Sequence, residues 1–191
     1  MVTALDVAGY VYKHLGWVDA WKLEKLTYFA QAWHLAWDGR PLFDDEIQAW
    51  ADGPVIPKVH RVNKFHRMGA YDTELPGSHP EAVVGSAERV IQAVLDFYGG
   101  MDKHTLIELT HGDSPWLEAR GDLAEGEMGN ETISVKEMRR CYSRKALEGE
   151  QCAPRPPSMI PAQVQGGPRY QRAIDHEMER WAETLALLAE R

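Results

Sequence analysis

The stretch DAWKLEKLTYFAQAWHLAW, residues 19–37, decides the fold of this chain. Asp19 is a residue type that begins helices, and neither glycine nor proline interrupts the residues after it. Its apolar residues recur at helical spacing and cover more than one narrow stripe: Leu23, Leu26, Phe29, Ala30, Trp33, Ala36 and Trp37. The polar residues fall on the opposite side: Glu24, Thr27, Gln31, His34 and Asp38. A helix this apolar is expected at the centre of a bundle.

Helix signals also occur on both sides of this stretch. Thr3-Ala4-Leu5-Asp6 resembles a capping box, and Gly16 ends the helix that follows it. Further helices are expected at residues 58–68, 86–98, 102–109, from 116 onward, and at 138–147 behind a capping box at 134–137. Residues 43–51 are also predicted to form a short helix, because their early acids, Asp44, Asp45 and Glu46, suit a positive helix N-terminus.

Strand signals are weak. Thr132-Ile133 is a candidate for a short strand beside the segment near Val55, but two residues do not decide it. The fold class predicted is therefore mainly α: a compact multi-helix globular domain with at most a minor short β element, plus a Pro-linked C-terminal amphipathic helix.

The domain organisation follows from a change in composition. A chain of 191 residues with 44% hydrophobic content suffices for one core. We predict a helical domain at 1–148, a proline- and glycine-rich linker at 149–168 and an amphipathic helix at 169–191. The apolar stripe of that last helix must pack on the domain, which we favour, or on a partner.

Charge and composition exclude several classes of function. The formal net charge of -8 makes nucleic acid an unlikely main partner, since phosphate binding needs clustered positive charge. No apolar run has the length of a membrane span, and the N-terminus lacks the features of a signal peptide. The two cysteines show no disulfide or metal spacing. We therefore expect a cytoplasmic protein without membrane contact, and the sequence gives no indication of its oligomeric state.

One run suggests acid/base chemistry. Leu109-Thr110-His111-Gly112-Asp113-Ser114-Pro115-Trp116 brings a histidine, a carboxylate and hydroxyls close together in sequence. No nucleophile elbow accompanies them, which favours structural roles. None of the eight histidines forms a His-Glu-x-x-His motif or a paired-ligand spacing, and no glycine-rich phosphate loop is present. We predict no catalytic residue, no metal site and no cofactor.

Tryptophans and a basic cluster are the candidates for partner binding. Seven tryptophans exceed what a small helical core readily buries, and tryptophan is enriched among the anchors of protein interfaces. A basic cluster spans residues 58–67, although most such clusters are solvated faces. The candidate partner-binding residues are Trp17, Trp21, Lys58, Arg61 and Trp181.

Several motifs occur together in a fixed order. They are residues 22–35 (KLEKLTYFAQAWHL), 39–43 (GRPLF), 49–57 (AWADGPVIP) and 109–116 (LTHGDSPW). In this order they resemble the Panacea domain, the family of SocA-like antitoxins and phage-associated GepA proteins, from about Thr3 to Leu147. The Ala-Trp-x-x-Gly-Pro-Val run is the most specific part, because no general rule for helices requires it.

The resemblance implies a nearly all-helical domain whose members neutralise unrelated toxins by direct contact, some of them as adaptors that pass the toxin to a protease. It implies no catalytic residues. We therefore expect a non-enzymatic antitoxin with a cognate toxin protein as partner. The alternatives are a proteolytic adaptor that engages a host protease and a small hydrolase that uses His111 and Asp113. The family-motif positions are expected to hold the fold: Trp50, Gly53, Pro54, His111 and Trp116.

Overall fold

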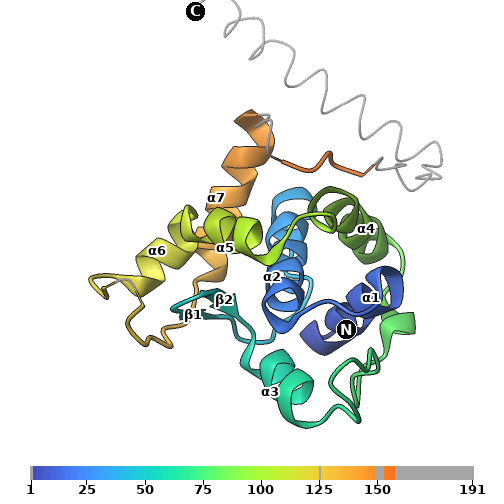
Figure 1. Ribbon diagram of the computed structural model, residues 1–191. Helices are drawn as coiled ribbons and strands as arrows, with labels where there is room; N and C mark the ends of the chain where they lie inside the picture. Colours follow the sequence, from blue (N-terminus) through green and yellow to red (C-terminus); the bar gives the residue numbers. More distant parts are fainter. Residues whose placement is uncertain (1, 125, 149–152, 158–191) are drawn as a thin grey trace, which may run out of the picture. The chain divides into compact units, whose positions relative to one another are not determined.

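Helix α2 (Ala20–Trp37) lies at the centre of the computed structural model, which describes residues 2–124, 126–148 and 153–157 (Figure 1). The Asp19 carboxylate accepts a hydrogen bond from the Lys22 N–H (3.1 Å) and so caps the first turn. Every residue from Leu23 to Leu35 is buried. The prediction of a central helix is confirmed, because α1, α4, α5 and α7 all pack against α2.

The other helices are α1 (Ala4–Leu15), α3 (Pro57–Phe65), α4 (Ser86–Tyr98), α5 (Lys103–His111), α6 (Ser114–Arg120) and α7 (Val135–Glu148). A single 3₁₀ turn, η1, spans Pro80–Ala82. The capping box at the start of α1 is formed: Thr3 and Asp6 each accept a hydrogen bond from the other's backbone N–H. The mainly helical fold class is thus confirmed.

Aromatic side chains from α2, α4 and α7 form the centre of the core. Trp33 is 1% exposed, and its indole N–H donates to the Tyr98 hydroxyl (3.1 Å). The Phe29 ring stacks on Tyr98 at a centroid distance of 4.2 Å. Tyr142 of α7 meets Trp33 edge to face at 5.2 Å. The three helices therefore share one aromatic cluster, with the polar tips paired inside it.

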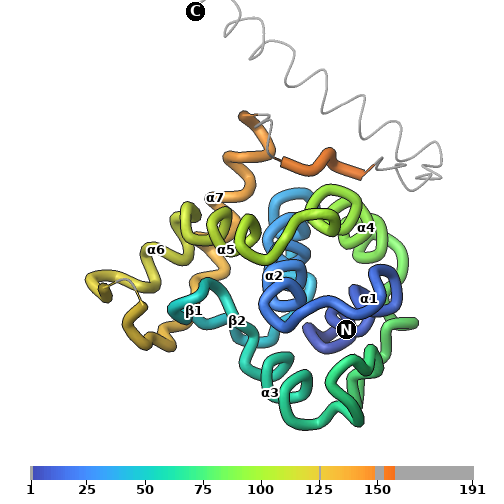
Figure 2. Tube along the Cα trace, in the orientation of Figure 1, coloured from blue at the N-terminus to red at the C-terminus, as the bar shows by residue number. Residues whose placement is uncertain are grey.

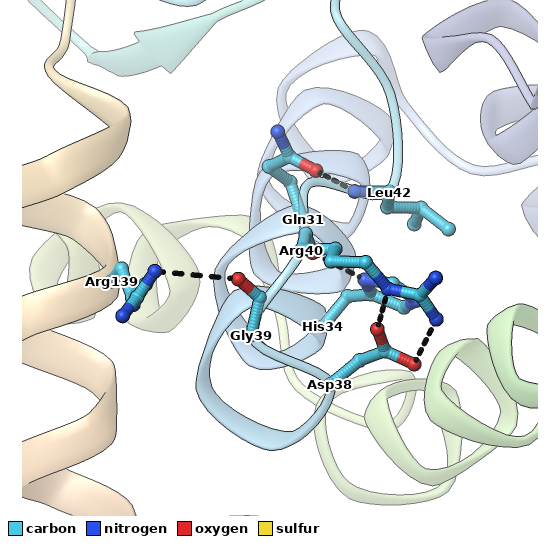
Figure 3. A network of polar contacts seen from close by, with 7 residues as sticks. All are labelled: Gln31, His34, Asp38, Gly39, Arg40, Leu42 and Arg139. Carbon is cyan, nitrogen blue, oxygen red and sulfur yellow. Dashed lines mark hydrogen bonds and ion pairs between the residues drawn. The ribbon is translucent and has the colours of Figure 1, made fainter.

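The polar side of α2 is buried too, and it holds the chain that leaves the helix (Figure 3). The Gln31 side chain accepts a hydrogen bond from the Leu42 N–H (2.7 Å) and donates to the Phe43 carbonyl (3.0 Å). One turn later, His34 Nδ1 lies 2.8 Å from the Arg40 carbonyl oxygen. Residues 40–43 therefore run back along α2, with their backbone polar groups paired by side chains of that helix.

The helix predicted over residues 43–51 is wrong. Strand β1 (Gln48–Trp50) pairs antiparallel with β2 (Gly53–Val55), and the residues before β1 are extended (Figure 2). The acids at residues 44–46 favour a helix locally. The backbone of residues 47–50 instead forms hydrogen bonds with β2 and with residues 131–133, and a strand conformation is needed for these bonds. Asp45, one of those acids, instead accepts a hydrogen bond from the Ala4 N–H (2.8 Å) at the start of α1.

The short strand left open at Thr132-Ile133 is a single bridge. Thr132 pairs antiparallel with Gln48 in β1, the residue that also pairs with Val55 of β2. Two further hydrogen bonds flank this bridge: Ala49 N–H to the Glu131 carbonyl (2.9 Å) and Ile133 N–H to the Ile47 carbonyl (2.8 Å). The segment before α7 thus lies on the edge of β1 that β2 leaves free.

None of the helices within the described residues combines the length and apolar composition of a membrane span. The predicted helix at 169–191, with Trp181, lies outside the described residues. Of the predicted linker at 149–168, only residues 153–157 are described, and they are not helical. The predicted domain boundaries stay predictions.

Replacing Trp33 by alanine tests the central aromatic cluster. We expect Trp33→Ala to lower the free energy of unfolding by about 3–5 kcal/mol, the usual cost of truncating a buried large aromatic residue. Denaturant unfolding followed by circular dichroism measures this. Leu147→Ala, at an exposed position of α7, is the control and should change stability by about 0.5 kcal/mol or less. Near-equal values for the two variants would contradict the central position of α2.

Candidate functional site

A pocket of about 820 Å³ opens where the start of α2, the β1–β2 hairpin, α3 and residues 128–130 meet. Its volume is in the range of sites that bind small molecules or anchor side chains. The lining residues are Ala20, Trp21, Glu24, Lys25, Trp50, Ala51, Asp52, Val55, His60, Asn63, Lys64, Arg67, Ala70, Met128, Gly129 and Asn130. The pocket is therefore built around the family-specific run of the hairpin.

The hairpin is fixed from behind by α6. The Trp116 indole N–H donates to the Trp50 carbonyl (3.0 Å), and Trp116 itself is buried. The Trp50 ring faces the pocket side and meets His60 of α3 edge to face at 4.9 Å. The His111 ring stacks on the Trp116 ring at a centroid distance of 4.1 Å, so His111 packs against the side chain that holds the hairpin. The structural roles expected for Trp50, His111 and Trp116 stay predictions.

Gly53 stands at the point of closest approach between the hairpin and two helices. Its φ is 99°, a conformation that residues with a Cβ rarely adopt. A Cβ at this position would lie 2.7 Å from Thr110 Oγ1 and 2.8 Å from Lys25 Cε. Neither side chain moves away freely, because Thr110 donates to the Ile107 carbonyl and Lys25 to the Pro54 carbonyl. Glycine is thus required here by conformation and by space together.

Two neighbouring charged residues of α2 form the floor of the pocket. Glu24 is 2% exposed and Lys25 is 1% exposed. One Glu24 oxygen, Oε2, accepts a hydrogen bond from the Ile56 N–H (2.9 Å), and Lys25 Nζ donates to the Pro54 carbonyl (2.9 Å). The other oxygen, Glu24 Oε1, has no hydrogen-bond partner among the described residues. Lys25 therefore holds the backbone of β2, Glu24 holds the backbone of the residue after it, and Glu24 keeps one polar atom for the pocket.

Burial sets the protonation of this pair. Loss of solvent raises the pKa of Glu24 from its ordinary value of 4.5 to about 8, against the Ile56 N–H bond and the attraction of Lys25, which lower it. Loss of solvent likewise lowers the pKa of Lys25, against the attraction of Glu24 and Asp52. The floor of the pocket thus disfavours charge on either residue.

Several exposed apolar side chains are neighbours, in contact or in sequence, of residues that line the pocket. Trp17 and Trp21 are 45% and 44% exposed. Trp21 donates its indole N–H to Asp52 (3.2 Å), and Trp17 donates to the Ala70 carbonyl (3.1 Å). The apolar rim, as we name it, consists of Trp17, Trp21, Phe65, Met68 and Tyr71, each of them exposed.

The predicted basic contact residues lie elsewhere on α3. Lys58 pairs with Asp45 (3.1 Å), and Arg61 is exposed. Neither lines the pocket, whose α3 side consists of His60, Asn63 and Lys64. Partner binding by Lys58 and Arg61 stays a prediction, and Trp181 lies outside the described residues.

The residues required by the hydrolase hypothesis, His111 and Asp113, do not line this pocket. Asp113 is 1% exposed and accepts hydrogen bonds from the Tyr142 hydroxyl and from Lys145 Nζ. His111 stacks on Trp116, and neither His111 nor Asp113 lines the pocket described above. Within the described residues, no group of three or more histidine, cysteine, aspartate or glutamate side chains is placed to hold a metal ion.

Sequence reasoning missed the most distinctive residues of this site, Glu24 and Lys25. Two adjacent charged residues inside an otherwise apolar helix were a usable signal, because such residues are rarely buried without a specific partner. The partners, however, lie about thirty residues later in β2 and Ile56. Periodicity along α2 does not reveal them.

Comparison with known proteins shows similarity to a protein family. Residues 23–117 match the model of a family described as "Antitoxin SocA-like, Panacea domain". The match begins in α2, contains the hairpin and α3, and ends inside α6, a shorter range than the resemblance read from the motifs. No curated protein and no solved structure matches the chain.

Alanine at position 53 tests the close approach of the hairpin to α2. We expect Gly53→Ala to cost about 2–4 kcal/mol of stability, because strain from the positive φ adds to the overlap with Lys25 and Thr110. Gly39→Ala is the matched control: its φ is +81°, but a Cβ there meets nothing within 4 Å, so about 1–2 kcal/mol is expected. Thermal unfolding compares the two. Equal losses would show that space at Gly53 is not limiting.

The raised pKa of Glu24 predicts a pH dependence of stability. Between pH 5 and 7 the folded chain retains a proton on Glu24 that the unfolded chain releases, so this residue's contribution to stability falls as pH rises. Glu24→Gln does not titrate. The unfolding free energy of the wild-type chain, relative to Glu24→Gln, should therefore decrease from pH 5 to pH 7 in denaturant titrations. Parallel pH profiles would mean that Glu24 is not desolvated.

Proposed function

Because residues 23–117 carry a Panacea domain of the SocA-like antitoxin family, we propose that this chain is an antitoxin that neutralises a toxic partner protein by direct binding, in the cytoplasm and without catalysis. The family match is the single observation that carries the proposal. The toxin's own chemistry does not follow from it, since one fold serves partners of many kinds.

The pocket and its apolar rim are the surface that we assign to the toxin. Exposed tryptophan, phenylalanine and methionine side chains gathered around a concave site are typical of protein interfaces. The rim is bound together by contacts of its own: Tyr71 meets Trp17 edge to face at 5.0 Å. Lys103 Nζ lies 4.7 Å from the Trp21 ring, so the indole face is held in place while part of it stays exposed. A rim ordered before binding lowers the entropic cost of association.

Asp113 connects two helices. One of its oxygens accepts a hydrogen bond from the Tyr142 hydroxyl and the other accepts one from Lys145 Nζ. These bonds join α6 to α7, a role in the fold.

Substitution of the rim tests this function in cells that express a toxic neighbouring gene. Trp21→Ala combined with Phe65→Ala should reduce neutralisation at least about tenfold, because interface anchors of this type are worth 1–2 kcal/mol or more each. Growth rescue and co-purification of the toxin measure the effect. Leu117→Ala, a half-exposed apolar residue of α6 that does not line the pocket, should rescue growth like the wild type.

Two further measurements distinguish direct binding from the hydrolase and from the proteolytic adaptor. His111→Ala should neutralise within a few-fold of wild type, provided that its melting temperature shows a folded domain; a folded but inactive variant would favour the hydrolase hypothesis. Toxin half-life should be unchanged by the antitoxin if binding alone neutralises, whereas a shortened half-life would favour the proteolytic adaptor. A neighbouring gene that is harmless when expressed alone, with no partner co-purifying, would remove the antitoxin proposal.

A further inference from the structure

The oxygen Glu24 Oε1 is an unused polar atom in the pocket floor. The side chain is 98% buried, since 2% of its surface is exposed, and it lines the pocket. Oε2 is engaged by Ile56, while Oε1 has no hydrogen-bond partner among the described residues. Buried polar atoms in native proteins are almost always paired, and those that are not call for a ligand or a functional explanation. A group that enters the pocket and reaches Glu24 would supply this missing bond.

The charges around the pocket select an uncharged group. A cation at the floor would find no ionised carboxylate, because burial raises the pKa of Glu24, and it would share the pocket with Lys64 and Arg67. A carboxylate at the floor would meet Lys25, whose charged form burial disfavours, and it would share the pocket with Asp52. Burying either ion without a full countercharge is costly. The occupant is therefore a neutral polar group.

The protonation state of Glu24 indicates which neutral polar group would pair with it. Its raised pKa means that the carboxyl is largely protonated near neutral pH and ionised at higher pH. An N–H group only donates, and a carbonyl only accepts, so each suits one of the two forms. A hydroxyl does both, and can pair with Oε1 in either form.

The apolar and aromatic residues that line the pocket favour an aromatic ring as its occupant. Trp21, Trp50, Val55 and Met128 line it, and Trp50 is held from behind by Trp116 and from the side by His60. Aromatic rings pack well on such faces in edge-to-face or offset geometry, and methionine adapts to their edges. The volume of about 820 Å³ leaves room for the residues on either side of the ring.

We propose that the pocket receives a tyrosine side chain of the toxin, whose hydroxyl pairs with Glu24 while its ring packs between Trp21 and Trp50. This rests on the proposed antitoxin function. The basic side chains at the mouth, Lys64 and Arg67, favour a toxin segment that is neutral or acidic around the tyrosine.

Small aromatic probes test the pocket without the toxin. The dissociation constants of p-cresol, toluene and indole for the full chain are measured by NMR from the indole N–H resonances of its tryptophans. We expect p-cresol to bind about tenfold more tightly than toluene, the difference that one hydrogen bond to a buried carboxyl supplies, and more tightly than indole. Equal binding of p-cresol and toluene, or tighter binding of indole, overturns the proposal. This comparison needs no variant to fold.

Three variants test whether Glu24 causes the preference for p-cresol over toluene. Glu24→Met should bind p-cresol and toluene alike, whereas Glu24→Gln, which can still pair with a hydroxyl, should keep most of the tenfold preference. Asp44→Asn, at an exposed carboxylate that does not line the pocket, is the control and should behave like the wild type. A Glu24→Met variant that melts as a folded protein and keeps the preference overturns the assignment to Glu24.

The toxin itself provides the last comparison. Changing its tyrosines singly to phenylalanine should yield one variant that binds the antitoxin about tenfold more weakly. If every such variant binds like the wild-type toxin, no tyrosine of the toxin occupies the pocket, and the proposal fails even if p-cresol binds there. If no toxin binds at all, the antitoxin function fails, while the probe measurements still report on the pocket.

Discussion

The buried polar side of α2 is the constraint on which the rest of this structure depends. A central helix in a bundle ordinarily meets its neighbours through apolar side chains on every side. Here Glu24, Gln31 and His34 instead pair with backbone groups of residues 40–56, the chain that follows the helix. Because these backbone groups are buried, they need partners inside the protein. The helix supplies them, and in doing so determines the path of the hairpin.

The pocket is a consequence of that path. The hairpin is held by Lys25 and Glu24 of α2 and by Trp116 of α6, and its turn lines the pocket together with α3. Gly53 permits the approach, since any Cβ there would meet both α2 and α5. The run that most specifically marks the family is thus the run that needs these contacts. Its residues serve the fold and shape the pocket at once.

The described tryptophans divide between two roles by their place in the chain. Trp33 lies inside the bundle and Trp116 behind the hairpin, each with its indole N–H paired. Trp17 and Trp21 flank the cap at Asp19, where the chain turns from α1 into α2, and both keep nearly half of their surface exposed. The turn between the two helices therefore leaves apolar surface available beside the pocket, as an interface requires.

The sequence by itself predicted the central helix and the caps at the starts of several helices. Thr3, Asp19 and Asp102 each act on backbone groups within three residues of themselves, so the signal and its effect lie in one short window. Tertiary structure alone decided that residues 43–51 are not helical but contain strand β1, and that Glu24 lines a pocket. The hydrogen bonds responsible join β1 to residues 131–133 and Glu24 to Ile56, partners that no local pattern contains. The local preference for a helix at the acids of residues 44–46 is worth a fraction of about 1 kcal/mol. Leaving one buried hydrogen-bonding group unpaired costs about 1–3 kcal/mol, so the tertiary hydrogen bonds outweigh the local preference.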